Sequence, residues 1–412
     1  MEELLVEALG NGVGGIAKPA GGRVTFIPGA LPGETVLCEP GPARGSWREA
    51  VLFEVLSPSP DRVEPFCPIS AECGGCPLQH LRYEEQLRWK REWVSSALSK
   101  AGTAHPGVGA VMPSACTRSY RNRVTFEVEL GHLCLHRRRG DLLRAGGCPL
   151  LDERGRELAR ILDGNAGDGP CRIAVRTSST DGRRAIEMDG DAPPLPGLPP
   201  DTAVWRRGLR GWVGPADAEP LREEIAGLPI RVPVGGFFQV NTRGASDMSS
   251  FIADSLGACE GMRVLDLYGG AGTFSIPLAA RGAKALCVDS SPESLAAARA
   301  SAADLGLADA FEALERDAGV FLSEPGPGGR FDAVIADPPR AGMGSREAGL
   351  LAGLGAGAIV MVSCNPFTLA RDLRVLSESY RVTRVAPFDL FPHTDHVETV
   401  CFLERKPGEA RD

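Results

Sequence analysis

The chain has 412 residues, of which 43% are hydrophobic and 24% are charged, and its net charge at pH 7 is −8. This length exceeds what one hydrophobic core supports, so several domains are expected. The acidic balance excludes a protein coated in positive charge for indiscriminate nucleic-acid binding. No apolar run reaches bilayer length, and acid stands at the N-terminus where a secretory signal carries base, so we expect a cytoplasmic protein without a membrane partner.

Residues 1–56 alternate short apolar runs with glycine turns, a spacing typical of five short strands in a small β-barrel. The run from Phe26 to Glu34 resembles the TRAM domain, a small RNA-binding barrel of the OB-like type. The resemblance implies a first domain at residues 1–58 that contacts RNA.

Three cysteines, Cys67, Cys73 and Cys76, lie close together in a sequence that holds 12 cysteines. Structural disulfides are rare in a reducing compartment, and such thiols suit an iron–sulfur cluster. Zinc is the alternative, although a zinc site usually shows two CxxC pairs. Cys148 repeats the Gly-Cys-Pro surroundings of Cys76 and is our choice of fourth ligand. The competitors for that place are Cys116, Cys134 and Cys171.

The segment 81–144 has a local excess of base, with twelve lysines or arginines against six acids, a charge of +6. A focused basic face on an acidic protein fits selective RNA contact, and solvated helix faces are the alternative. Residues 83–100 have helical spacing. Strand-like runs at 124–130, 173–176 and 202–205 predict an antiparallel β region, so we expect a mainly β central part at 59–235 that carries the cluster and recognises RNA.

From residue 236 onward the pattern changes to alternating strands and helices, which predicts an α/β domain at 236–412. Its expected units are strands at 264–268, 283–289 and 331–336 and a third unit that ends at Asp317. A glycine turn that includes Gly270 and Thr273 follows the first strand, and Asp289 ends the second, where an acid suits ribose hydroxyls. The ordered set resembles the class I, Rossmann-like methyltransferases that use S-adenosylmethionine.

Cys364 follows the apolar run 359–363, which reads as a buried strand that stops at Asn365-Pro366. A cysteine at the carboxyl end of such a strand lies where ligands collect in α/β sheets. The alternative interpretation is a small buried hydrophobic residue. The neighbouring strand is expected to end at Asp337, so Cys364 is predicted to face the donor pocket.

A thiolate at this place suits one reaction in particular. Carbon 5 of uracil accepts a methyl group only after a thiolate adds to carbon 6, and a base must then remove the hydrogen from carbon 5. Glu398 lies where an apolar-alternating strand begins and is the candidate base. An ordinary carboxylate on an edge strand is the alternative for Glu398.

Nearly the whole chain resembles the RNA uracil-5 methyltransferases, which make 5-methyluridine. The matching segments are Phe237 to Asn241, Asp266 to Gly270, Asp337 to Arg340, Ser363 to Pro366 and His393 to Val400. The resemblance implies that Cys364 is the nucleophile and Glu398 the base. It implies donor contacts by Gln239, Tyr268, Asp289 and Asp337, and Gly270, Thr273 and Asp317 are further donor-site candidates. Tyr268, Thr273 and Asp289 stand where the family often has phenylalanine, asparagine and glutamate.

The same resemblance assigns a 4Fe-4S cluster to Cys67, Cys73, Cys76 and Cys148. Family members that act on transfer RNA generally lack both the cluster and the TRAM domain, which points to 23S ribosomal RNA as the substrate. We also expect the enzyme to be a monomer. The target base must leave its stack to reach Cys364. We therefore predict a multidomain α/β protein with a small β-barrel, a central β region and a methyltransferase domain.

Three alternatives remain open. A uracil-5 methyltransferase for transfer RNA shares the reaction, whereas an iron–sulfur RNA-binding factor would be non-catalytic. An amino-group methyltransferase also uses Asp-Pro-Pro, but that motif continues with an aromatic residue where this chain has Arg340. Such an enzyme needs no cysteine nucleophile.

Overall fold

The computed structural model describes residues 1–19, 22–138, 140–167, 171–190, 195–209, 211–257, 259–324 and 330–407. The chain forms two compact units. The first comprises Met1–Trp93, His136–Leu143 and Phe391–His396, and the second comprises Val94–Leu135, Arg144–Leu390 and Val397–Asp412. The three-part division expected from the sequence stays a prediction. Among the described helices, none combines the length and apolarity needed to cross a membrane.

The first unit contains one six-stranded sheet with the order β1-β5-β6-β4-β3-β2. Its strands are β1 (Glu2–Leu5), β2 (Ala8–Gly10), β3 (Gly14–Ala17), β4 (Val24–Ile27), β5 (Thr35–Arg44) and β6 (Trp47–Ser57). Five strands were expected, and the additional β2 has three residues. Because β1 and β2 lie at opposite ends of the order, strand pairing among the described residues does not close this sheet into a barrel.

Helix α1 (Tyr83–Lys100) has the bounds predicted from the helical spacing. Acidic side chains in its first turn and Lys100 in its last turn complement the helix dipole. Val94 and Leu98 are fully buried in its second half, as the apolar spacing predicts. Helix α1 carries the chain from the first unit into the second.

The central part of the chain forms a seven-stranded sheet with the order β13-β12-β11-β10-β7-β8-β9. Its strands are β7 (Arg123–Glu129), β8 (His132–His136), β9 (Leu142–Arg144), β10 (Arg172–Thr177), β11 (Arg184–Asp189), β12 (Thr202–Gly208) and β13 (Gly211–Val213). The pairs between β7 and β8, β7 and β10, and β10 and β11 are antiparallel, as expected, whereas β11 and β12 are parallel. Helix α2 (Glu153–Leu162) buries an apolar face that includes Leu158 against this sheet. The hairpin β14 (Arg222–Ile225) and β15 (Leu228–Arg231) follows.

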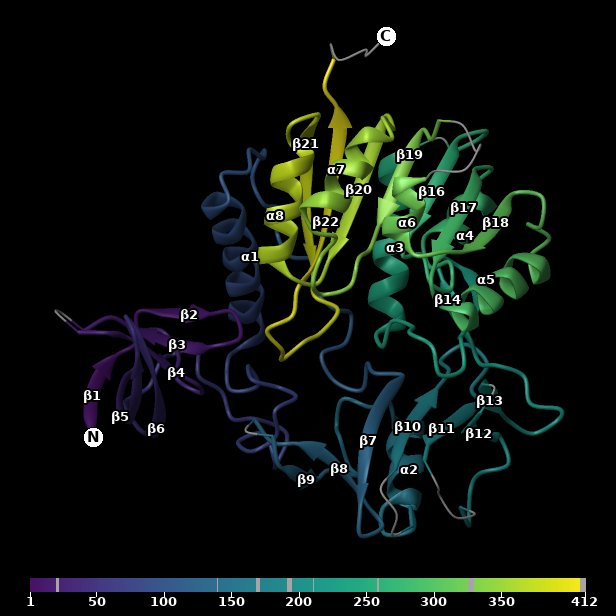
Figure 1. The fold of residues 1–412 in the computed structure, drawn as a ribbon. Coiled ribbons are helices and arrows are strands. Elements are labelled where there is room, and N and C mark those ends of the chain that lie inside the picture. Colours follow the sequence, from purple (N-terminus) through teal and green to yellow (C-terminus); the bar gives the residue numbers. More distant parts are fainter. Residues whose placement is uncertain are drawn as a thin grey trace. The chain divides into compact units, whose positions relative to one another are not determined.

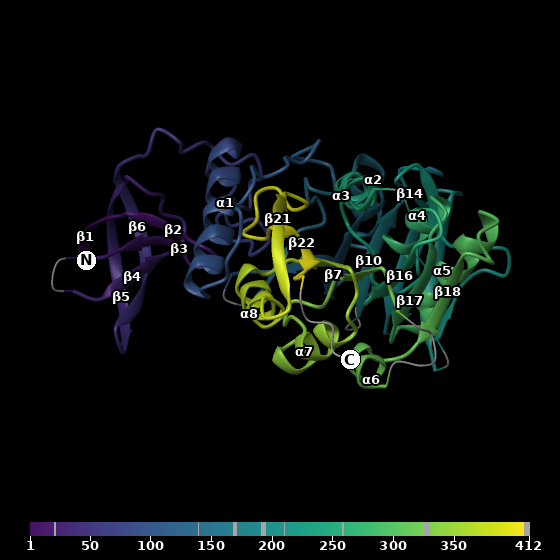
Figure 2. The ribbon, with the colours of Figure 1, turned by 90° about the horizontal axis from the view of Figure 1, so that it is seen from above.

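The last part is an open α/β sheet with the order β18-β17-β16-β19-β20-β22-β21. Its strands are β16 (Arg263–Leu267), β17 (Lys284–Asp289), β18 (Phe311–Glu315), β19 (Ala333–Ala336), β20 (Ala358–Ser363), β21 (Tyr380–Phe388) and β22 (Glu398–Arg405). Its helices are α3 (Thr242–Leu256), α4 (Ser275–Ala280), α5 (Pro292–Asp304), α6 (Ala318–Ser323), α7 (Ser345–Gly353) and α8 (Pro366–Leu376). Helices α6, α7 and α8 cover one face, and α3, α4 and α5 lie on the other (Figures 1 and 2).

Two features of this topology indicate where a ligand would bind and which residues would lie beside it. The chain order reverses between β16 and β19, and ligands of doubly wound sheets bind outside the carboxyl ends of the strands at such a switch point. Strands β16 to β20 are parallel, but β22 runs antiparallel between β20 and β21. The first residue of β22 therefore lies at the same edge of the sheet as the last residues of β19 and β20.

Candidate active site

Cys364 follows the last residue of β20 and precedes the cap of α8. The strand forms because residues 359–362 are apolar and fully buried. It ends where the Asn365 side chain accepts a hydrogen bond from the Phe367 N–H at 3.0 Å, and Pro366 occupies the first turn of the helix. The thiol is thus held, half-buried, at a strand-to-helix turn. The structure confirms the predicted strand and its end.

Glu398 begins β22, and its strand partner places it beside the cysteine. Ser363 of β20 and Thr399 of β22 form the last pair of their ladder, and Cys364 and Glu398 are the residues next to this pair, so they lie close together at its end. Glu398 is 4% exposed. The edge-strand alternative for Glu398 is wrong, because β22 lies between β20 and β21.

Asp337 is the third group at this edge. It follows β19, which is paired with β16 on one side and β20 on the other. Its backbone N–H donates to the Leu267 carbonyl at 3.3 Å. The site thus brings together one thiol and two carboxyl groups that lie far apart in the sequence.

Burial and neighbouring carboxyl groups raise the pKa of all three groups. Burial raises the pKa of Cys364 to about 12, with further increases from Glu398 and Asp337, while Arg340 acts in the opposite direction. Burial and then Asp337 raise the pKa of Glu398. Burial and then Asp266 raise the pKa of Asp337. A carboxylate with a raised pKa is a stronger base at neutral pH, whereas the thiol needs help to ionise.

The turn that carries Arg340 is fastened to the helix behind Cys364. The Arg340 carbonyl accepts hydrogen bonds from Asn365 Nδ2 and Thr368 Oγ1, both at 3.3 Å. The Asp372 carboxylate, 1% exposed, accepts the N–H groups of Met343 and Gly344. The exposed guanidinium is therefore attached to a fixed backbone next to the thiol.

We predict that Arg340→Gln displaces the pH–rate profile of the enzyme to higher pH. Loss of the positive charge raises the pKa of Cys364 further, so less thiolate is present at neutral pH and activity there falls roughly tenfold. The loss of activity relative to the wild-type protein should become smaller as the pH rises. Measured kcat/KM across pH tests this, with exposed Arg346→Gln as the control. An unchanged profile with a higher KM for RNA would instead assign Arg340 to RNA contact alone.

The glycine turn after β16 forms the second part of the site. Gly270 has φ +54°, and its N–H donates to Asp289 Oδ2 at 2.9 Å. The other oxygen of Asp289, which ends β17 as predicted, accepts the Ser291 N–H at 2.7 Å. A Cβ on Gly269 would lie 2.6 Å from the sulfur of Cys287, so glycine permits this close turn.

Asp266 lies under that turn and is fully buried. Its Oδ2 accepts the Ser275 N–H at the start of α4, and burial raises its pKa to about 7. Several carboxyl groups thus face one small region at the carboxyl ends of β16, β17 and β19. Such a region suits a ligand that carries hydroxyl groups and positive charge.

The Tyr268 side chain contacts helix α7. Its backbone has φ +59°, a strained conformation for a tyrosine, and its hydroxyl donates to Glu347 Oε2 of α7 at 2.7 Å. In this structure the hydroxyl is directed to Glu347. The sequence reasoning missed Glu347, since no motif marks it.

The remaining donor-site candidates occupy three different elements. Asp317 caps α6 by accepting the Val320 N–H at 3.0 Å. The Thr273 carbonyl accepts a hydrogen bond from Ser249 Oγ at 2.9 Å. Gln239 is 7% exposed and lies just before α3. All three belong to the second unit, together with Cys364 and Glu398.

The predicted cluster cysteines are divided between the two units. Cys67, Cys73 and Cys76 belong to the first unit, and Cys148 belongs to the second. Burial raises the pKa of the Cys67 thiol, and neighbouring Cys73 raises it further. Within the described ranges, no group of three or more histidine, cysteine or acidic side chains is arranged to hold a metal ion. The arrangement therefore does not add support for a cluster.

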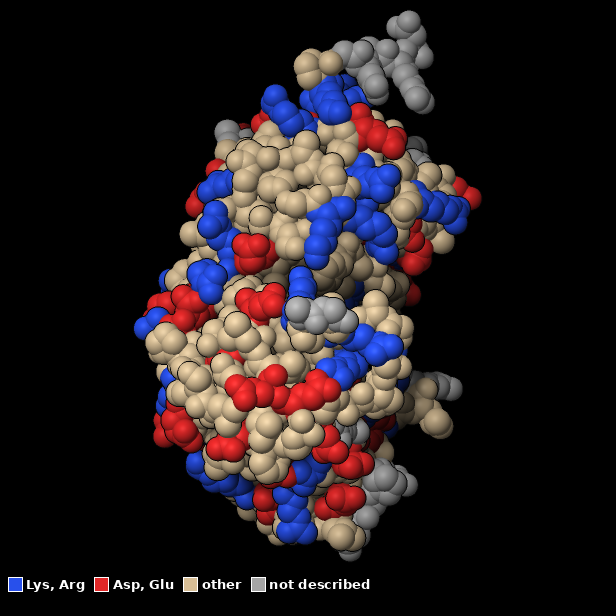
Figure 3. Space-filling model, turned by 90° about the vertical axis from the view of Figure 1, so that its left-hand side faces the viewer, with Lys and Arg blue, Asp and Glu red and all other residues tan. Residues whose placement is uncertain are grey.

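The basic excess at 81–144 is partly neutralised. Four of its arginines form ion pairs: Arg82 with Asp61, Arg88 with Glu85, Arg123 with Glu187 and Arg137 with Glu72. Arg139 lies outside the described residues. On the face that Figure 3 shows, basic and acidic side chains are interspersed. The local charge therefore does not by itself define an RNA-binding surface.

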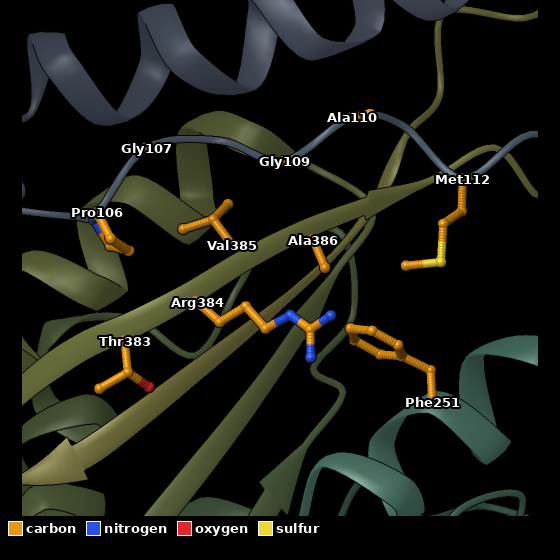
Figure 4. Close-up of a pocket in the computed structure, with 10 residues that line it drawn as sticks. All are labelled: Pro106, Gly107, Gly109, Ala110, Met112, Phe251, Thr383, Arg384, Val385 and Ala386. Carbon is orange, nitrogen blue, oxygen red and sulfur yellow. The ribbon is translucent and has the colours of Figure 1, made fainter.

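A hollow beside β21 lies apart from these groups. It is bordered by the segment 106–112, by Phe251 of α3 and by residues 383–386 of β21 (Figure 4). The Arg384 guanidinium lies 4.2 Å from the centre of the Phe251 ring. None of the candidate catalytic or donor-site residues lines this hollow.

Comparison with known proteins gives a consistent set of relatives. Residues 326–406 match the family model described as tRNA (Uracil-5-)-methyltransferase, and residues 249–361 match one described as Conserved hypothetical protein 95. The 23S rRNA (uracil(1939)-C(5))-methyltransferase of Alkalilimnicola ehrlichii is 32% identical, over 95% of this chain and 93% of that protein. An uncharacterised RNA methyltransferase of Listeria monocytogenes is 29% identical over 96% and 95%.

A solved structure resembles the chain over its full length. It is the tRNA (uracil-54, C5)-methyltransferase of Pyrococcus abyssi in complex with S-adenosyl-L-homocysteine, with a TM-score of 0.78 and 26% identity. The match covers 98% of this chain and 100% of that one. These similarities extend across both units.

Proposed function

The chain belongs to the RNA uracil-5 methyltransferase family, and from this premise we propose that it methylates carbon 5 of a uridine in 23S ribosomal RNA. It is an S-adenosylmethionine-dependent RNA methyltransferase. The observation that carries the proposed mechanism is the ladder between β20 and β22, which brings Cys364 close to Glu398. A non-catalytic RNA-binding factor does not fit this family.

In the proposed first step, the Cys364 thiolate adds to carbon 6 of the extruded uracil, and the electron pair of the double bond moves to form an enolate. Carbon 5 then attacks the methyl group of the donor sulfonium, which leaves as the neutral thioether. Glu398 takes the hydrogen from carbon 5 as a proton, and the carbon–sulfur bond to Cys364 breaks to restore the double bond. The addition step thus uses Cys364, and the elimination step uses Glu398.

Several residues of the chain have the properties that these proposed steps require. Glu398 is buried and has a raised pKa, as a base that must act near neutral pH requires. Arg340 favours the thiolate of Cys364. We propose that Asp337 lies close to both the uracil and the donor, while Asp289 binds the donor's ribose hydroxyls, with Gln239, Tyr268, Gly270, Thr273 and Asp317 as further contacts.

Ribosomal RNA is the preferred substrate because the ribosomal RNA enzyme of Alkalilimnicola is the more similar relative in sequence. Transfer RNA is the second candidate, supported by the full-length structural match to the Pyrococcus enzyme. Purified protein should be given fragments of 23S ribosomal RNA and transfer RNA transcripts, and 5-methyluridine should be mapped by mass spectrometry. Methylation confined to transfer RNA would reject the ribosomal proposal and keep the reaction.

We also propose that Cys67, Cys73, Cys76 and Cys148 hold a 4Fe-4S cluster, although no step above depends on it. The support is the spacing of the cysteines and the family resemblance. Anaerobically purified protein should contain iron and acid-labile sulfide, and both should fall in Cys73→Ser. Cys259→Ser, at a cysteine that is neither a proposed ligand nor a competitor for the fourth place, is the control. Wild-type protein without iron and sulfide would end this proposal.

A further inference from the structure

The loop before α3 carries Gln239 but is not part of any strand ladder. Phe238 and Gln239 are buried, at 3% and 7% exposure, whereas Phe237 is 69% exposed. Backbone groups in a buried irregular loop need hydrogen-bond partners from outside the loop, and those partners decide where its side chains lie. The residues that hold this loop therefore control the position of Gln239.

Asn122, one residue before β7, supplies such partners. Its backbone N–H donates to the Val240 carbonyl at 2.9 Å, and its Nδ2 donates to the Gln239 carbonyl at 3.1 Å. Nδ2 also lies 2.9 Å from Thr242 Oγ1 at the start of α3. A single residue of 6% exposure thus contacts the loop at Gln239 and at two positions that follow it.

Asn122 is itself fixed to the central sheet. Its carbonyl accepts a hydrogen bond from the Thr177 N–H of β10 at 2.8 Å. The buried carboxylate of Glu223 lies 3.4 Å from Nδ2, and burial raises the pKa of Glu223. Asn122 therefore connects the central sheet to the loop with little freedom to move.

One atom of Asn122 shows that its orientation has a cost. Nδ2 is surrounded by acceptors, which sets the orientation of the amide, and the buried Oδ1 then has no donor among the described residues. A buried acceptor without a donor is unfavourable, and such groups persist where function or the surrounding contacts require them. An apolar side chain would avoid this cost but would release the Gln239 carbonyl.

We propose that Asn122 is a positioning residue for the methyl transfer: it holds the Gln239 loop so that Gln239 reaches the methyl donor. The inference rests on the proposed function and adds a residue from the central sheet to the site. A second anchor holds the same loop, since Asn241 Nδ2 donates to the Leu390 carbonyl at 2.9 Å. Asn122 differs in that it bonds to Gln239 directly.

A double-mutant cycle with Gln239 tests this inference, with kcat and the KM values for RNA and donor measured for each variant. Asn122→Ala should lower kcat about tenfold or more, by releasing Gln239. The double variant Asn122→Ala/Gln239→Ala should be no slower than Gln239→Ala, because residues that act as one unit are not additive. Fully additive losses, or wild-type kcat in Asn122→Ala, would overturn the inference.

Two controls separate this role from folding. Asn165 also donates its side-chain amide to a backbone carbonyl, that of Ile161 at 2.9 Å, and exposed Asn165→Ala should retain wild-type kcat. If Asn122→Ala does not fold, Asn122→Asp keeps the volume and removes the donor, and it takes the same place in the cycle. Failure of the wild-type enzyme to form 5-methyluridine would reject the proposed function, whereas a fully active Asn122→Ala variant would reject only this inference.

Discussion

Replacing Cys364 by alanine is expected to abolish methyl transfer to RNA. Without the thiolate, no covalent bond forms at carbon 6, and carbon 5 of uracil stays too weak a nucleophile to take the methyl group. The substitution removes a half-buried side chain at a strand-to-helix turn, so the fold should persist. Transfer of labelled methyl groups from S-adenosylmethionine to RNA measures the effect.

A second cysteine variant shows whether the loss of activity is specific to Cys364. Exposed Cys116→Ala removes another thiol of the same unit and should leave turnover unchanged. Binding of S-adenosylhomocysteine to Cys364→Ala should also persist, since the proposed donor contacts come from other residues. Full turnover by Cys364→Ala would support a direct transfer, as in amino-group methyltransferases, and would remove the covalent mechanism.

Replacing Glu398 by glutamine is expected to slow turnover by about 10²- to 10⁴-fold, the range typical of a general base. The amide cannot take the proton from carbon 5, so the methylated uracil stays bonded to Cys364 and the adduct accumulates. Glutamine has nearly the same shape, which limits disturbance of this buried position on β22. Denaturing gels of the variant with RNA and donor should show a protein–RNA band.

Glu404 provides a matched control on the same strand. It is exposed and pairs with Arg381, so Glu404→Gln should turn over normally and show no stable adduct. A slow Glu398→Gln variant that accumulates no adduct would place Glu398 before the covalent step. In that case its carboxylate would act as the base that takes the proton of the Cys364 thiol before the attack on carbon 6.

Local sequence signals were enough to predict several of the helix and strand bounds. Helix α1 has the predicted bounds, and the strand expected at 264–268 lies one residue earlier, at Arg263–Leu267. The end of β17 at Asp289 and of β20 before Cys364 follows from apolar runs that stop at turn-forming residues. These features depend on neighbours in the chain, which a sequence shows directly.

Features that depend on distant partners were not predictable in the same way. No local pattern shows that β22 inserts between β20 and β21, yet this pairing decides that Glu398 lies close to Cys364. The contacts of Tyr268 with Glu347 and of Asn122 with Gln239 join separate elements and carry no motif. Likewise, the raised pKa of Asp337 results from burial, which only the folded structure provides.

The central claim is a covalent bond between Cys364 and carbon 6 of the target uracil. RNA in which 5-fluorouridine replaces uridine tests it in the wild-type enzyme, because fluorine on carbon 5 cannot leave as a proton and the adduct is trapped after methylation. Proteolysis and mass spectrometry of the trapped complex should then identify the modified residue. We predict a methylated fluorouridine on the peptide that contains Cys364. The claim would be contradicted by an adduct on another residue, or by methylation of unsubstituted RNA with no adduct on the fluorinated RNA.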